Sequence, residues 1–114
     1  MGGVGVRLVE ITDGLSNTLL VGEKHVPIKE FGVGPLDSSA YNGDYPSCMT
    51  RGAGQGVGLA TVLDDPGWKF GSYHMAVCQF VFCDGSVQGI HHNINPDTLF
   101  LLASRNDGQV IPDY

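Results

Sequence analysis

An Asp-Gly pair between two apolar runs constrains this chain more than any other feature. Asp84-Gly85 follows the run Val77–Cys83 and precedes the run Ser86–His92. Asp-Gly favours a two-residue type I′ turn, which joins two antiparallel strands. We therefore predict a β-hairpin with strands at 77–83 and 86–92, so the fold must contain an antiparallel sheet.

A two-residue turn also sets the register of the hairpin. It places Cys83 opposite Ser86 and Cys78 opposite His91. Because successive side chains of a strand point to opposite faces, one face of the hairpin collects most of the bulky apolar residues. The residues on this predicted core face are Cys78, Phe80, Phe82, Val87, Gly89 and His91.

The number of turn formers sets the fold class. The chain has 17 glycines and 6 prolines among 114 residues, and both residue types weaken helix interiors. They suit short strands joined by many turns. We predict a single domain, residues 1–114, of the α+β class: a β-rich antiparallel sheet with the C-terminal hairpin, one short helix and long Gly-rich loops. Further strands are expected at 7–10, 19–26, 39–41, 59–62 and 109–111.

The single helix is predicted to follow the hairpin. Asn95 is suited to the N-cap, Pro96 to the first helical position, and the negative charge of Asp97 to the positive end of the helix dipole. Gly108 can adopt the left-handed conformation that ends many helices. The helix is therefore expected to begin after Asn95 and to end at the segment 106–108.

Net charge excludes two classes of partner. The formal charge is −6, and the six Lys and Arg residues form no cluster. A nucleic-acid interface and an anionic membrane surface both need clustered basic residues, so neither is expected. The first ten residues lack the charged and apolar regions of a signal peptide. As written, the chain carries no export signal and is expected to be cytoplasmic.

Three of the four histidines are predicted to gather at the open end of the hairpin. Strand rise is about 3.3 Å per residue, so Asp84 should lie roughly 20 Å from Val77 and far from His74. The open end instead collects four side chains that could bind a zinc-like divalent metal: His74, Cys78, His91 and His92. Ordinary structural or surface histidines are the alternative. No complete catalytic set is recognisable, so catalytic residues are unknown and no other cofactor is expected.

Several aspartates in loops suggest a second metal hypothesis. Carboxylate oxygens are ligands for Ca²⁺, although turn formation is the alternative role of such residues. The loop aspartates in question are Asp13, Asp37, Asp44, Asp64 and Asp65.

The spacing from His74 to Asp84-Gly85 resembles the H-x9-D-G signature of a prepilin-like family abundant in planctomycetes. The blocks that carry the resemblance are Phe70-Gly71-Ser72, Asp84-Gly85-Ser86-Val87, Ile11-Thr12-Asp13-Gly14, Ser16-Asn17-Thr18, Val21-Gly22-Glu23, Tyr41-Asn42-Gly43-Asp44 and Arg105-Asn106-Asp107-Gly108. One departure is Met75-Ala76-Val77, where the family usually has Pro-Gly-Gly after the histidine. This replacement is expected to continue the strand toward His74.

The resemblance implies a structural role. Family members look like type II secretion pseudopilins and type IV pilins, with a cleaved leader, an apolar stalk helix and a periplasmic or cell-surface head anchored in the inner membrane. This chain looks like the C-terminal portion of such a head without leader and stalk. An apolar sheet face would then be exposed and would favour a homo-oligomer.

Three functions follow from these observations. The first is a self-associating assembly module whose full-length parent meets secretion or pilus components. The second is a small metal-dependent hydrolase of phosphate or carboxylate esters that uses the histidines. The third is a calcium-stabilised binding module.

Overall fold

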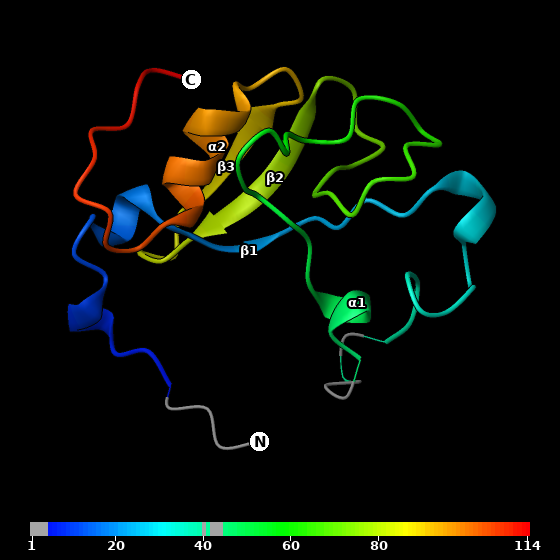
Figure 1. Cartoon of the computed structure of the whole chain (residues 1–114), viewed down its shortest axis with the longest axis horizontal. Coiled ribbons are helices and arrows are strands. Elements are labelled where there is room, and N and C mark those ends of the chain that lie inside the picture. The colour runs from blue at the N-terminus through cyan, green and yellow to red at the C-terminus, as the bar shows by residue number, and fades with distance from the viewer. Residues whose placement is uncertain (1–4, 40, 42–44) are drawn as a thin grey trace.

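A three-stranded antiparallel sheet forms the centre of the structure (Figure 1). The computed structural model describes residues 5–39, 41 and 45–114. Within this part of the chain the strand order is β1-β2-β3, and the α+β class predicted from the sequence is confirmed. The elements are η1 (Leu8–Glu10), η2 (Leu15–Asn17), β1 (Leu19–Gly22), η3 (Ile28–Glu30), α1 (Pro46–Met49), β2 (Val77–Phe82), β3 (Val87–His91) and α2 (Pro96–Ala103).

The predicted hairpin is present, but its register differs by one residue from the prediction. Val77 pairs with His91, and Cys78 pairs with Ile90. The β2 side of the predicted core face is correct, because Cys78, Phe80 and Phe82 are buried. The β3 side is wrong, since Ile90 is buried there whereas Val87, Gly89 and His91 are exposed.

The turn explains the shift in register. The N–H of Phe82 donates to Ser86 O (2.8 Å) and the N–H of Gly85 donates to Phe82 O (2.9 Å), so three residues form the loop. Only Gly85 has a positive φ there (87°). A type I′ turn needs positive φ at both central residues, whereas a three-residue loop needs only one, at its last position. Asp84 keeps a negative φ, and the longer loop results.

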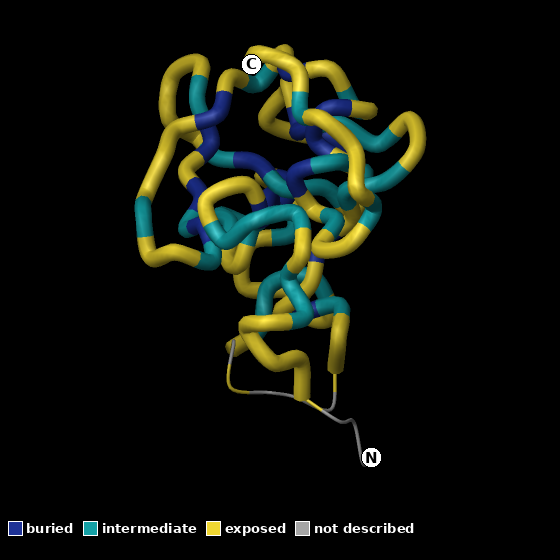
Figure 2. The backbone as a smooth tube through the Cα atoms, turned by 90° about the vertical axis from the view of Figure 1, so that its left-hand side faces the viewer, coloured by how far each residue is buried: buried dark blue, intermediate teal, exposed yellow. Residues whose placement is uncertain are grey.

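One face of the sheet packs against α2. Leu99 and Leu102 of the helix are buried in the same cluster as Phe80, Phe82 and Ile90. Figure 1 shows α2 lying across β2 and β3, and Figure 2 shows the buried residues concentrated in this part of the molecule. The sheet therefore has a covered face that forms the core and a second face turned away from α2.

The helix begins as predicted and ends early. The Asn95 side chain accepts a hydrogen bond from the N–H of Asp97 (2.8 Å), and Pro96 occupies the first turn. The last helical residue is Ala103, and the Ser104 hydroxyl donates to Phe100 O (2.9 Å). Gly108 does adopt a left-handed conformation (φ 68°), but it lies beyond the end of the helix at Ala103.

The strand β1 is shorter than predicted and irregular. A bulge lies between Leu19 and Val21. Gly22 then passes close to two aromatic rings: a Cβ at this position would lie 2.3 Å from Phe80 Cε1 and 2.9 Å from Phe70 Cδ1. The strand ends at Gly22. The N–H of Glu23 still donates to Gln79 O of β2 (3.2 Å), and Lys24 then bridges to Phe70. The predicted strand 19–26 therefore ends at Gly22.

Several short strands predicted from the sequence do not form. Residues 7–10 include the 3-10 helix η1, in which the Glu10 carboxylate accepts from the N–H of Arg7 (2.7 Å). Residues 59–62 and 109–111 contain no strand. The prediction for 39–41 includes residue 40, which lies outside the described residues. Among the described helices, none combines the length and apolar character needed to cross a membrane.

Candidate functional site

His74 lies at the open end of the hairpin, where it meets an acidic residue that sequence spacing did not suggest. Its Nε2 is 3.1 Å from Glu23 Oε1. The other Glu23 oxygen accepts from the N–H of Gln79 (2.7 Å), and the N–H of Glu23 donates to Gln79 O (3.2 Å). Glu23 therefore pairs with β2 through both its backbone and its side chain. The pair links two blocks of the resemblance that are 51 residues apart.

The loop after His74 turns sharply at Ala76. Ala76 has φ 66°, a conformation that costs a residue with a side chain but not a glycine. β2 begins only at Val77, so the expected continuation of the strand toward His74 does not occur. A glycine at position 76 would adopt this turn without strain.

Cys78 and His91 were predicted to face each other, and the observed register separates them. Cys78 belongs to the core, whereas His91 is exposed on the opposite face. Burial, assisted by the nearby charge of Glu23, raises the pKa of the Cys78 thiol to about 12. A thiol with so high a pKa stays protonated at neutral pH, and the thiolate is the form that binds metals.

His92 lies in a cleft of about 380 Å³ that His74 also lines. The N–H of His92 donates to Ala76 O (2.9 Å). Its Nε2 is buried and has no hydrogen-bond partner among the described residues. Within the described part of the chain, no group of three or more His, Cys, Asp and Glu side chains is placed to hold a metal ion. The four predicted ligands therefore do not converge in this structure.

The predicted calcium-binding aspartates are also dispersed. Asp37 lies 3.6 Å from Lys24 Nζ, Asp64 lies 3.0 Å from Lys29 Nζ, and Asp65 lies 2.9 Å from Lys69 Nζ. The Lys69 ammonium holds the pKa of Asp65 below its usual value. Asp44 lies outside the described residues. Each described aspartate of this set is thus engaged by a different lysine, apart from Asp13.

Asp13 fastens the C-terminal segment to the N-terminal segment. Its two carboxylate oxygens accept from the N–H groups of Asp107 and Gly108, both at 2.9 Å. These bonds hold the pKa of Asp13 below its usual value. The next residue, Gly14, has φ 100°, which suits glycine. The Asp13-Gly14 block and the segment 105–108 therefore meet in space although they lie at opposite ends of the sequence.

Asp84 stabilises the hairpin turn from within. One carboxylate oxygen accepts from the N–H (2.9 Å) and the hydroxyl (2.6 Å) of Ser86, and both bonds lower the pKa of Asp84. The N–H of Asp84 donates to Leu15 O (3.0 Å). Asp84-Gly85 thus shapes the turn and ties it to η2, and it lies far along the strand from His74, as the strand rise predicts.

Two basic residues that the sequence did not single out organise the long Gly-rich loop. Lys24 Nζ donates to the carbonyls of Leu36, Ser38 and Cys48. Arg51 is buried, and its guanidinium donates to four carbonyls, at His25, Leu36, Ser47 and Thr50. Burial lowers the pKa of Arg51. No spacing motif predicts these contacts, because their acceptors are backbone groups.

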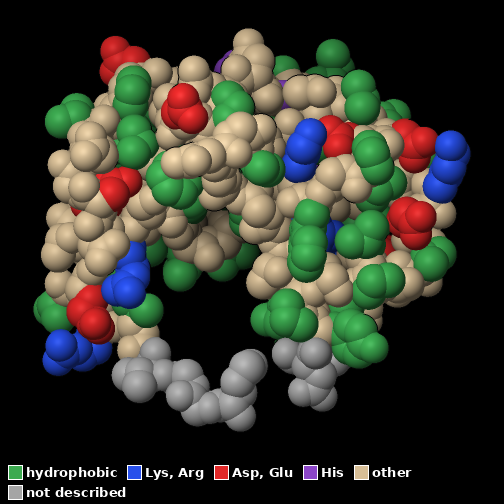
Figure 3. Space-filling model, viewed as in Figure 1, with side chains coloured by type: hydrophobic (Ala, Val, Ile, Leu, Met, Phe, Trp, Pro, Cys, Tyr) green, Lys and Arg blue, Asp and Glu red, His purple; other side chains and the backbone are tan. Residues whose placement is uncertain are grey.

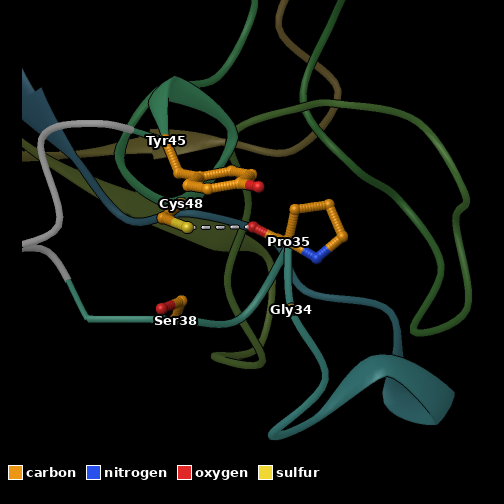
Figure 4. Close-up of a pocket in the computed structure, with 5 residues that line it drawn as sticks. All are labelled: Gly34, Pro35, Ser38, Tyr45 and Cys48. Atoms are coloured by element: carbon orange, nitrogen blue, oxygen red, sulfur yellow. Dashed lines mark hydrogen bonds between the residues drawn. The ribbon is translucent and has the colours of Figure 1, made fainter.

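The same loop forms a pocket of about 460 Å³ (Figure 4). Its lining includes the Tyr45 ring and Ser38, and the Cys48 thiol at its wall donates to Pro35 O (3.1 Å). Cys48 is almost fully buried, so little of the thiol is open to a ligand. All three cysteines of the chain are free.

The sheet face turned away from α2, here called the open face, is apolar and exposed. Val21 of β1, Val81 of β2 and Val87 of β3 stand opposite one another across the sheet. Val21 is 60% and Val87 62% exposed. Gly89 and His91, also exposed, lie on the same face of β3. The open face thus presents a row of valines to its surroundings.

A hollow lies beside β1, between the N-terminal segment and the part of the chain that contains α1 (Figure 3). Part of it is a pocket of about 230 Å³ lined by the residues of β1 together with Arg51, Ala53, Phe70, Phe80 and Ala103. Leu20, at the bulge, is 64% exposed. The apolar surface of the sheet therefore continues from the open face around the β1 edge.

Comparison with known proteins identifies one match. A family model described as "Protein of unknown function (DUF1559)" matches residues 2–97. Neither the curated proteins nor the solved structures gave a match.

Proposed function

We propose that this chain, which belongs to the DUF1559 family of proteins of unknown function, is a non-enzymatic assembly module that associates with copies of itself through its sheet. The observation that carries the proposal is the open face, where Val21, Val81 and Val87 form one row across all three strands. Two of these three valines expose more than half of their surface, which a protein that works as an isolated monomer has reason to avoid.

The distribution of charge also supports association through the sheet. The three strands contain no Asp, Glu, Lys or Arg, although the chain as a whole carries a net charge of −6. Two copies repel each other in general, and the sheet is where they can approach with the least repulsion. Added salt screens that repulsion and should strengthen the association.

An assembly role accounts for more of the observations than a hydrolase does. The hydrolase hypothesis needs His74, His91 and His92 to hold one metal. His74 and His92 line the same cleft, but no group of three or more possible ligands lies together among the described residues. The blocks shared with the prepilin-like family serve the fold instead: Asp13 fastens the C-terminal segment, Glu23 pairs with His74, and Asp84 shapes the hairpin turn.

The wider setting of the module is also a proposal. The resemblance to prepilin-like proteins supports a role as part of a pilin-like head, periplasmic or at the cell surface in the full-length parent. Secretion or pilus components would then be its partners, in addition to copies of itself. The calcium hypothesis has less support, because the described aspartates of the predicted set are held by lysines or by backbone N–H groups.

Two valine-to-lysine variants test the proposal. Val87→Lys places a charge on the open face, whereas Val110→Lys places the same charge on a valine that is 88% exposed beyond α2. Light scattering should show association of the wild type that grows with concentration and with salt. Val87→Lys should remove this association, and Val110→Lys should leave it as in the wild type. Equal effects of the two variants would contradict a role for the open face.

A further inference from the structure

We propose that two copies pair through the free edge of β3, antiparallel and around a twofold axis at Gly89, so that two three-stranded sheets become one sheet of six strands. This inference rests on the proposed self-association and names the strand edge, next to the open face, through which two copies would pair. Its starting point is the position of β3 at one end of the strand order β1-β2-β3.

The hydrogen bonds to β2 show which groups of β3 are free. The N–H of Phe82 donates to Ser86 O, and the N–H of His92 donates to Ala76 O. In an antiparallel ladder, hydrogen-bonded and non-hydrogen-bonded pairs alternate. Residues 86, 88, 90 and 92 therefore point their backbone groups toward β2. Residues 87, 89 and 91 point theirs outward, and the observed pairs with Val81, Gln79 and Val77 are the non-hydrogen-bonded ones.

Most of the outward groups have no partner in the described part of the chain. His91 O accepts from the N–H of Ile94 (3.0 Å). No hydrogen bond within the described residues uses the N–H or the carbonyl of Val87 or Gly89, or the N–H of His91. Such a row of free donors and acceptors is a template for another strand.

The side chains along this edge do not protect it. Natural edge strands are usually protected by charged residues, proline or a bulge. The segment Val87–His91 contains no Lys, Arg, Asp, Glu or Pro, and its register with β2 runs without a shift over five residues. β1, the other edge, has four residues and a bulge. Of the two edges, β3 is therefore the better template.

A second copy fits this edge because the edge is complementary to itself. With Gly89 opposite Gly89 of the second copy, Val87 lies opposite the second copy's His91, and the reverse holds across the axis. The N–H and carbonyl of each Gly89 then bond to the other, with no side chain at the centre of the contact. The open faces of the two copies would then form one continuous surface, on which the row Val21, Val81 and Val87 of one copy meets His91 and Val77 of the other.

The small area of this contact predicts a weak association between the two copies. Pairing two five-residue strands buries less than the roughly 800 Å² per partner of a standard stable interface. The dissociation constant should therefore lie between about 10 µM and 1 mM. Association of this strength becomes complete where copies are held at high local concentration, as in an assembly.

Amide hydrogen exchange of the wild type, followed by NMR, tests the pairing residue by residue. At about 20 µM the amides of residues 87, 89 and 91 should exchange fast, whereas those of 88 and 90 are protected by β2. At about 1 mM the first set should slow by about twofold or more, and the second set should change little. If amide exchange slows only at Leu20 and Val21, the contact lies at β1 and the inference is overturned.

Two variants of Gly89 provide an independent test by sedimentation velocity. Gly89→Pro removes the outward N–H, a change that edge strands tolerate, and should abolish dimers. Gly89→Ala keeps the N–H and adds a Cβ at an ordinary 3.5 Å from Val77 Cβ, so dimers should persist. The amide spectrum of each variant at low concentration checks that it is folded.

The outcomes separate the inference from the function on which it rests. Dimers lost in Gly89→Pro and retained in Gly89→Ala would support β3 pairing. Two outcomes would overturn β3 pairing and leave self-association intact. One is that Gly89→Pro still forms dimers, and the other is that the wild type forms dimers without slower amide exchange at residues 87, 89 and 91. A wild type that stays monomeric at about 1 mM would overturn both.

Discussion

Replacing Gly22 by alanine should weaken the fold more than its small size suggests. The added Cβ would lie 2.3 Å from Cε1 and 2.6 Å from Cδ1 of Phe80, and 2.9 Å from Cδ1 of Phe70. Phe80 is 1% exposed and belongs to the central core cluster, so its ring has little room to move. The two rings also contact each other, with centroids 5.4 Å apart.

The expected loss follows from these contacts. Overpacking a core by one methyl group costs about 1–3 kcal/mol. Disturbing the aromatic pair adds about 0.5–1.5 kcal/mol. Gly22→Ala should therefore lower the free energy of unfolding by about 2–4 kcal/mol. For a chain of this length that corresponds to a fall in Tm of roughly 10 °C.

Urea unfolding of Gly22→Ala and Gly89→Ala side by side measures this effect. Gly89 is also in a strand, but the nearest atom to an added Cβ is Val77 Cβ at 3.5 Å. Gly89→Ala should be neutral or slightly stabilising, because alanine has less freedom to lose on folding. The Gly22→Ala midpoint should fall with an unchanged m-value. Equal midpoints for both variants would refute the argument from close packing at Gly22.

Four further changes test other contacts, each read from the urea midpoint. Glu23→Ala should cost about 1–2 kcal/mol because the N–H of Gln79 loses its acceptor, and Glu23→Gln, which keeps an acceptor, should cost less than half as much; equal losses would contradict the role of that bond. Ala76→Gly should stabilise by about 1 kcal/mol by relieving the positive φ, and a loss of stability would show that the turn is unstrained. Asn95→Ala should cost about 1 kcal/mol through the lost helix cap, and no change would show that the cap is dispensable. The Cys78 thiol has its pKa raised from 9.0 to about 12 in the folded chain, so the unfolded state loses its proton first and stability should fall as pH rises from about 9 toward 12; Cys78→Val should lose less stability over that range, and parallel curves would contradict the shift.

Local signals in the sequence predicted the main elements of the fold. The run of apolar residues before Asp84-Gly85 predicted β2, and the Asn95-Pro96-Asp97 cap predicted the start of α2, because both depend on neighbouring residues. The register of the hairpin was wrong by one residue, since Asp84 retains a negative φ and the loop takes three residues. That single shift moved Ile90 into the core and His91 out of it.

The shift in register also separates Cys78 from His91, two of the four predicted metal ligands. The contacts that organise this region join residues far apart in the sequence. Glu23 meets His74, and Asp13 meets the segment 107–108, across sequence separations that no spacing pattern encodes. Arg51 and Lys24 were missed because their acceptors are backbone carbonyls of a loop without a regular pattern. The sequence blocks that resemble the prepilin-like family do contain Asp13, Glu23 and His74, which make these long-range contacts. The blocks did not indicate which segment contacts which.

Sedimentation equilibrium of the wild type tests the central claim most directly. The monomer has a mass of 12.1 kDa. Between about 10 µM and 1 mM the weight-average mass should rise toward twice that value, and the rise should begin at lower concentration when salt is added. A mass that stays at 12.1 kDa over this range, with and without added salt, would contradict self-association through the sheet.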